Sequence, residues 1–152
     1  MMVSGMKVEP VEILLVEDNP VDVMLAKEAF DSGRVCNNLH VTEDGEEAMD
    51  FLYKRGKYSS VPSPEIILLD LNLPKKDGRE VLTEIKKDPS LKHIPVIILT
   101  TSEDPDDIWR SYELQANCFM TKPVDMEQFT KALACLGEFW FTLVRLPVPP
   151  KP

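Results

Sequence analysis

The chain alternates short apolar runs with longer amphipathic segments. Each apolar run is rich in Val, Ile or Leu and ends where polar residues begin, as Ile66-Ile67-Leu68-Leu69 does before Asp70. Continuous apolar runs of this length are typical of strands buried on both faces, and their alternation with helical segments indicates a parallel sheet. We therefore expect strands near residues 11–17, 38–43, 66–71, 94–100 and 117–121.

Capping residues mark where the helices begin. Asn19 is a good N-cap, and Pro20 follows at the position where proline is favoured in a helix. Four apolar residues then share one face of this first helix: Val21, Met24, Leu25 and Ala29. Three later starts resemble capping boxes, with the caps Asp44, Asp77 and Asp125. Asp104 before Pro105 starts a fourth helix, which makes five strands and five helices in strict alternation, an α/β fold.

The length of 152 residues fits one domain whose sheet is covered on both faces. We expect an N-terminal extension over 1–10, a domain over 11–146 with an extended last helix, and a Pro-rich tail over 147–152. The segment 57–65 contains several prolines and serines and is predicted to be a surface loop without visible chemistry.

Charge and composition exclude several classes of function. The net charge of -9 argues against nucleic acid as a partner, because binding to phosphate backbones depends on Lys and Arg. No window approaches the roughly 18 apolar residues that span a bilayer, so no membrane partner is expected. Three cysteines without a C-x-x-C pair fit a reducing compartment, and we expect a cytoplasmic protein.

Polar side chains follow four of the predicted strands. Glu17 and Asp18 come after the first, Asp70 after the third, Thr100 ends the fourth and Lys122 follows the fifth. In an open parallel sheet the carboxyl ends of the strands form the edge where ligands bind. Three acids, a hydroxyl and an ammonium at that edge predict a site for a divalent cation and a phosphoryl group.

The three acids would repel one another, and a divalent cation relieves that repulsion. Mg²⁺ prefers hard oxygen ligands, so we expect direct ligation by Asp18 and Asp70 and a water-mediated role for Glu17. The backbone carbonyl of Asn72 is a further expected ligand. The competing interpretation is that Glu17 and Asp18 belong only to a helix-capping turn, but Asn19 and Pro20 explain that turn without two preceding acids.

Taken together, Glu17-Asp18, Asp70 with Pro74 and Gly78, Thr100, and Lys122-Pro123 resemble the motifs of a receiver domain of a two-component response regulator. The resemblance spans residues 11 to about 137. It implies a flavodoxin-like, doubly wound (βα)5 sheet with strand order 2-1-3-4-5. It also implies that Asp70 accepts a phosphoryl group from a sensor histidine kinase, that Mg²⁺ is the cofactor, and that Thr100 and Lys122 contact the phosphate.

A narrower resemblance links the long loop and the Glu138-Phe139-Trp140 extension to the single-domain regulators of cyanobacterial and bacterial phytochromes. It implies a phytochrome as the kinase. Phe119 stands where many receivers have an aromatic residue that rotates on phosphorylation, so Thr100 and Phe119 form the expected switch. Phe119 as an ordinary core residue is the alternative.

Two other functions are compatible with the expected fold. A Mg²⁺-dependent phosphohydrolase would also form an aspartyl-phosphate at Asp70, but haloacid-dehalogenase-like enzymes place an acid where this chain has Asn72. A flavodoxin-like cofactor carrier would need a phosphate-binding loop after the first strand, where the chain has Glu17 and Asp18. We therefore expect a signalling module that does not turn over substrate, rather than an enzyme.

The last helix carries more apolar residues than one packed face requires. We expect a homodimer through this surplus, with Trp109 as a neighbour. The expected interface residues are Trp109, Phe139, Trp140, Phe141 and Leu143. The alternative is that the extension folds back over its own domain.

Overall fold

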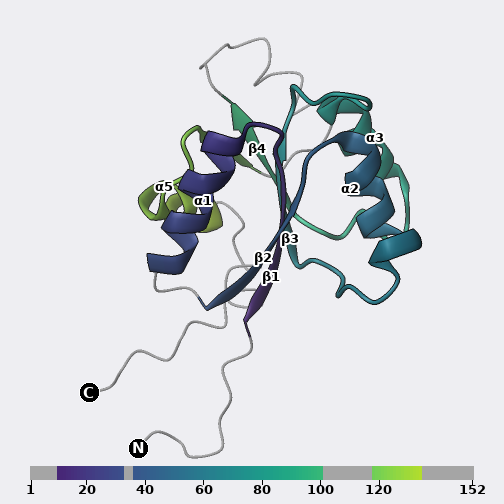
Figure 1. Ribbon diagram of the computed structural model, residues 1–152, viewed down its shortest axis with the longest axis horizontal. Coiled ribbons are helices and arrows are strands. Elements are labelled where there is room, and N and C mark those ends of the chain that lie inside the picture. The colour runs from purple at the N-terminus through teal and green to yellow at the C-terminus, as the bar shows by residue number, and fades with distance from the viewer. Residues whose placement is uncertain (1–9, 33–35, 101–117, 135–152) are drawn as a thin grey trace, which may run out of the picture.

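The computed structural model describes residues 10–32, 36–100 and 118–134 (Figure 1). In these ranges five parallel strands form one sheet in the order β2-β1-β3-β4-β5, as predicted. The strands are β1 (Val11–Val16), β2 (Asn37–Thr42), β3 (Ile66–Asp70), β4 (Val96–Thr100) and β5 (Cys118–Thr121). Every predicted boundary lies within about two residues of the observed one, a normal uncertainty for strand ends.

The described α-helices are α1 (Pro20–Ser32), α2 (Gly45–Leu52), α3 (Gly78–Lys87) and α5 (Met126–Ala134). Their predicted caps are confirmed. Asn19 Oδ1 accepts a hydrogen bond from the backbone N–H of Val21 at 2.9 Å. The carboxylates of Asp44, Asp77 and Asp125 likewise accept from the first turns of α2, α3 and α5. The predicted helix after Asp104 lies outside the described residues.

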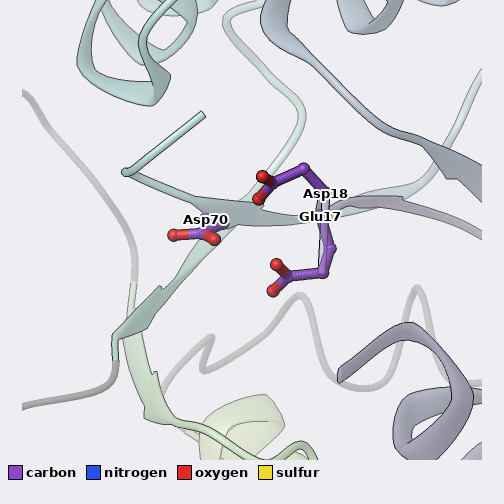
Figure 2. A group of neighbouring side chains, drawn as sticks. All are labelled: Glu17, Asp18 and Asp70. Atoms are coloured by element: carbon purple, nitrogen blue, oxygen red, sulfur yellow. The ribbon is translucent and has the colours of Figure 1, made fainter. Parts of the chain in front are cut away.

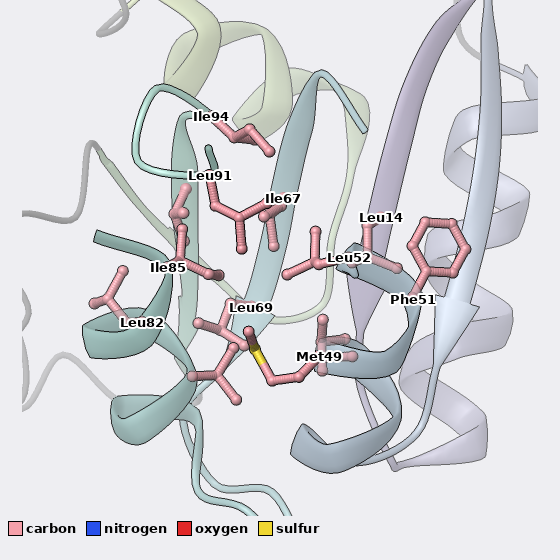
Figure 3. Packing of buried hydrophobic residues seen from close by; sticks show 14 of the residues in the cluster. Leu14, Met49, Phe51, Leu52, Ile67, Leu69, Leu82, Ile85, Leu91 and Ile94 are labelled. Carbon is pink, nitrogen blue, oxygen red and sulfur yellow. The ribbon is translucent and has the colours of Figure 1, made fainter. Parts of the chain in front are cut away.

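Helices cover both faces of the sheet. Figure 1 shows α1 and α5 on one face and α2 and α3 on the other. Beneath α1 and α5 the core includes Phe30 and Phe129, whose rings meet edge to face with centroids 4.7 Å apart. Beneath α2 and α3 a second cluster gathers Leu14, Leu69 and Ile85 with their neighbours (Figure 3). Burial on both faces explains why the strands read as continuous apolar runs.

The face of α1 that packs on the sheet differs from the predicted one. Ala26 and Phe30 are buried and Val23 packs against their cluster, whereas Val21 and Met24 are 57% and 51% exposed. Apolar residues occur around most of this helix, so periodicity alone did not identify the buried side.

The loop over 57–65 is also more structured than predicted. It begins in a 3-10 turn, η1 (Gly56–Tyr58), and the ring of Tyr58 lies 5.2 Å from that of Phe51. Tyr58 and Val61 therefore extend the core under α2 rather than facing only solvent. Among the described helices none is long and apolar enough to cross a membrane.

Two glycines fix the loop that follows β3. A Cβ atom on Gly78 would lie 2.2 Å from the carbonyl oxygen of Asp70, and the Gly78 N–H donates to the carbonyl of Leu71 at 3.0 Å. A Cβ atom on Gly45 would lie 2.0 Å from the carbonyl oxygen of Lys76. Backbone cannot yield at such distances, so both positions require glycine. The loop is thereby packed closely against the end of β3 and the start of α2.

Candidate phosphoryl and metal site

The sheet topology brings the predicted site residues to one edge. β1 and β3 are neighbours with Val16 opposite Leu69, so the next residues, Glu17 and Asp70, emerge side by side. Thr100 pairs with Thr121 across β4 and β5, which places Lys122 at the same edge. These strands are parallel, and the order of the sheet gathers groups that are up to 105 positions apart in the chain.

Glu17, Asp18 and Asp70 form a group that is compatible with one metal ion. One carboxylate oxygen from each lies within 4.8 Å of the other two. Figure 2 shows the three carboxyl groups around the ends of β1 and β3. Glu17 and Asp70 are buried, at 1% and 4% exposed, whereas Asp18 is exposed. The group therefore has a buried base and a side that is open to solvent.

Lys122 forms ion pairs with the two buried acids, Glu17 and Asp70. Its Nζ atom lies 2.8 Å from Glu17 Oε1 and 2.8 Å from Asp70 Oδ2, and its side chain is only 8% exposed. Burial alone would lower the pKa of Lys122, but the hydrogen bonds and attraction from Asp70 and Glu17 outweigh burial and raise it. The ammonium is therefore charged throughout the physiological pH range. The sequence predicts Lys122 on the phosphate side of the site, and in the structure it also lies against two of the expected metal ligands.

Two donors from the described residues hold the Asp70 carboxylate. The backbone N–H of Asn72 donates to Oδ1 at 3.0 Å, and Lys122 donates to Oδ2 at 2.8 Å. These contacts fix the orientation of the Asp70 carboxylate at the end of β3. The loop that contains Gly78 packs against the same end of β3. Asn72 itself is exposed at the mouth of the site.

Glu17 is the acid most affected by its surroundings. Burial, and then repulsion from Asp70, raise its pKa from 4.5 to about 7, although contact with Lys122 and the N–H of Asn19 acts in the opposite direction. Oε2 accepts the Asn19 N–H at 3.1 Å. Among the described residues, buried Oε1 has the Lys122 ion pair but no aligned hydrogen bond. A buried oxygen in this condition is suited to a cation.

The raised pKa of Glu17 predicts that metal binding weakens in acid. Below about pH 7 the folded protein holds a proton on Glu17, which removes the negative charge that would attract a cation. Metal affinity is therefore expected to increase as the pH increases through 7. We expect an apparent affinity about tenfold weaker near pH 6 than near pH 8, because the ionised fraction changes by that factor.

Calorimetric titrations at the two pH values measure this change. The Glu17→Gln variant, which cannot titrate, should bind the metal more weakly and lose most of the pH dependence. An unchanged pH dependence in Glu17→Gln would show that another group is responsible.

Several predicted residues are placed only in part or not at all. The backbone of Thr100 ends β4 as expected, next to β5. Phe119 is half-buried and packs against the cluster under α2 and α3. The expected interface residues lie outside the described residues: Trp109, Phe139, Trp140, Phe141 and Leu143. The same holds for residues 1–9 of the expected extension over 1–10 and for the tail over 147–152.

One charged residue at the site was not singled out from the sequence. Asp22, in the first turn of α1, has its Oδ2 atom 3.5 Å from Lys122 Nζ. The sequence signal near it was the capped helix start at Asn19, which predicts an acid in the first turn for reasons unrelated to a site. The contact itself is long-range and could not be inferred from spacing.

The donor set fits a divalent cation with oxygen ligands. Glu17, Asp18 and Asp70 supply carboxylate oxygens only, one side of the group is open, and a buried oxygen lacks a full set of partners. These are the properties expected for Mg²⁺ or a similar ion, which keeps several waters and binds through few carboxylates.

The fold and this edge define a class of protein, and the chain belongs to the response regulator receiver domain family. The family model matches residues 13–134. The chain is similar to response regulator Rcp1 of Synechocystis sp., with 48% identity over 91% of this chain and 94% of that protein. The Mn²⁺-bound crystal structure of Rcp1 matches with a TM-score of 0.73 over 91% of this chain and 99% of that one.

Two further solved structures are similar to the chain. The phosphorylated cyanobacterial phytochrome response regulator RcpA is 47% identical, with a TM-score of 0.74 over 91% of this chain and 99% of that one. The bacteriophytochrome response regulator AtBRR is also 47% identical, with a TM-score of 0.79 over 87% of this chain and 96% of that one. The receiver fold and the relation to phytochrome response regulators are therefore confirmed.

Proposed function

We propose that this receiver accepts a phosphoryl group on Asp70 from a sensor histidine kinase, with Mg²⁺ bound by Asp18 and Asp70 and assisted by Glu17. The observation that carries the proposal is the pairing of Asp70 with Lys122 at 2.8 Å, beside two further acids. A nucleophilic carboxylate, a permanent cation and a set of metal ligands thus meet at one point. The Asn72 carbonyl is the proposed further ligand.

In the proposed reaction an Asp70 carboxylate oxygen attacks the phosphorus of a phosphohistidine. The new O–P bond forms as the N–P bond breaks, and the electron pair of that bond stays on the leaving imidazole. The bound cation would neutralise charge on the phosphoryl oxygens. The Asn72 N–H orients Asp70, and Lys122 exchanges its contact with Asp70 for one with a phosphoryl oxygen. We propose that the Thr100 hydroxyl binds another, and that positioning and electrostatics supply the catalysis.

The proposed output is a change at a protein surface, with Thr100 and Phe119 as the switch. Phe119 packs beside the cluster under α2 and α3, so a shift of Thr100 toward the phosphoryl group would change the packing of this aromatic residue. The names of RcpA and AtBRR support a phytochrome-type kinase as the partner. The net charge of -9 supports a protein that does not bind nucleic acid, and the three cysteines without a C-x-x-C pair support a cytoplasmic location.

Stoichiometry separates this function from a Mg²⁺-dependent phosphohydrolase. With Mg²⁺ and a small phosphodonor such as acetyl phosphate, a receiver should take up one phosphoryl group per chain and then lose it slowly. A generic phosphomonoester should give essentially no turnover, because the chain has Asn72 where a general acid would be needed. Sustained release of phosphate from the phosphomonoester would contradict the proposal.

We also propose that the receiver forms a homodimer through its last helix. The support is the apolar surplus at Phe139, Trp140, Phe141 and Leu143, which one packed face does not account for. Sedimentation at micromolar concentration should show a dimer that is lost in a chain ending after Gly137. A chain ending after Leu146, which removes only the Pro-rich tail, is the control. A monomeric full-length chain, or a dimer that survives truncation at Gly137, would contradict this proposal.

A further inference from the structure

Asp22 lies on α1 within reach of the ammonium of Lys122. Its Oδ2 atom is 3.5 Å from Nζ, and its side chain is 24% exposed. The contact joins the first helix to the residue after β5, 100 positions further along the chain. Among the described residues Lys122 thus has three carboxylate partners, of which Asp22 is the most distant and the most accessible to solvent.

A capping-box hydrogen bond does not account for Asp22. It is the third residue of the helix, where an acid in a capping box accepts the backbone N–H of the N-cap residue. In α1 that N–H, on Asn19, donates to Glu17 Oε2 instead. In α2 the equivalent acid, Glu47, accepts a backbone N–H of its own helix start, that of Glu43, at 2.9 Å. Asp22 is therefore available to Lys122.

Metal ligation does not explain Asp22 either. Of the acids in the described part of the chain, the group close enough to share one ion contains Glu17, Asp18 and Asp70, and Asp22 is outside it. The two nearer partners of Lys122, Glu17 and Asp70, are both in that group. Of the partners of Lys122 among the described residues, Asp22 is thus the one that a bound cation would not contact.

We propose that Asp22 is a positioning residue that keeps the Lys122 ammonium at the phosphoryl site once Glu17 and Asp70 are engaged by a metal ion. The proposal rests on the proposed phosphoryl-acceptor function. Lysine has a long, flexible stem and a point charge, so its position depends on the charges around it. When its two nearer carboxylates turn to a cation, the attraction that holds Lys122 falls. The Asp22 carboxylate then supplies the remaining fixed negative charge that orients it.

The test is the affinity for beryllofluoride, a phosphoryl analogue, in protein saturated with Mg²⁺. Asp22→Asn keeps the size of the side chain and removes its charge. We expect about fivefold weaker binding, the factor that corresponds to an ion pair of ~1 kcal/mol. Asp22→Glu, which keeps the charge, should recover part of the loss. Asp31→Asn makes the same change at an exposed site near the other end of α1 and should bind as the wild type does.

A double-mutant cycle separates positioning from a general effect of charge. In a Lys122→Met background, Asp22→Asn should cause no further loss of beryllofluoride affinity. Wild-type affinity in Asp22→Asn, or the same loss in both backgrounds, would overturn the proposal. Failure of the wild type itself to bind beryllofluoride would instead refute the proposed function.

A second measurement does not depend on a bound metal or phosphoryl group. Urea unfolding is measured in a chelator for the wild type, Asp22→Asn, Lys122→Met and the double variant. It gives the coupling free energy between Asp22 and Lys122 in the metal-free protein. Non-additive effects on the free energy of unfolding are expected because the two groups are an ion pair in the structure. Additive effects would show that Asp22 does not act on Lys122, and would overturn the proposal independently.

Discussion

Asp70→Ala is expected to abolish phosphorylation of this receiver by a phosphorylated histidine kinase or by acetyl phosphate. The substitution removes the proposed nucleophile, and no other carboxylate has the same combination of neighbours among the described residues. Glu17 and Asp18 belong to the group of acids that could hold a metal ion. Of these two, Glu17 contacts Lys122, and it is buried at 1% exposed. Incorporation of labelled phosphate measures the effect.

The fold should survive this change, because Lys122 keeps its contact with Glu17 and one source of repulsion is removed. Circular dichroism checks this point. Asp50→Ala, at a half-exposed acid on α2, is the control and should label normally. Labelling of Asp70→Ala at the wild-type level would refute the assignment of the nucleophile.

Lys122→Met is expected to separate metal binding from phosphoryl binding. The ammonium contacts two of the proposed metal-binding acids, Glu17 and Asp70, so its removal takes away a competing charge, and the variant should bind Mg²⁺ at least as tightly. Beryllofluoride affinity should fall by at least about tenfold, since a hydrogen bond to a charged group contributes about 1.5–3 kcal/mol. Parallel NMR titrations with Mg²⁺ and with beryllofluoride measure both effects.

Without Mg²⁺, Lys122→Met should also have a lower free energy of unfolding at neutral pH than with Mg²⁺, because its clustered acids then lack both the ammonium and the metal ion. Lys131→Met is the control, because this lysine of α5 is exposed and, among the described residues, forms its ion pair with its helix neighbour Glu127. Unchanged beryllofluoride affinity in Lys122→Met would assign this lysine a purely structural role. Loss of Mg²⁺ binding would contradict the geometry described for the site.

The sheet could be predicted from the sequence because its strands are buried on both faces. Residues such as Ile67 and Leu68 face opposite helical layers and are both fully buried, so the strand appears as an unbroken apolar run. The helix starts were predictable because capping is local: Asn19 and Asp44 contact N–H groups two or three residues away. The main site residues followed from their common position at strand ends, which meet at one edge in a parallel sheet.

What the sequence did not predict depends on contacts between distant segments. The buried side of α1 is set by the packing of Phe30 on Phe129, almost 100 residues later, and not by the apolar pattern of the helix itself. Likewise, Asp22 acquires its role from Lys122, which reaches it only in the folded sheet. Tyr58 joins the core because its ring packs against that of Phe51 in α2, and no periodic pattern in the sequence predicts this contact.

The central claim is that Asp70 itself carries the phosphoryl group, and chemical trapping tests it most directly. Borohydride reduces an aspartyl-phosphate to homoserine, and peptide sequencing then locates the modified residue. After incubation of the receiver with Mg²⁺ and acetyl phosphate, we expect homoserine at position 70 and at no other acid, and none when a chelator replaces Mg²⁺. Homoserine at another position, or an unmodified Asp70 in protein that has taken up phosphate, would contradict it.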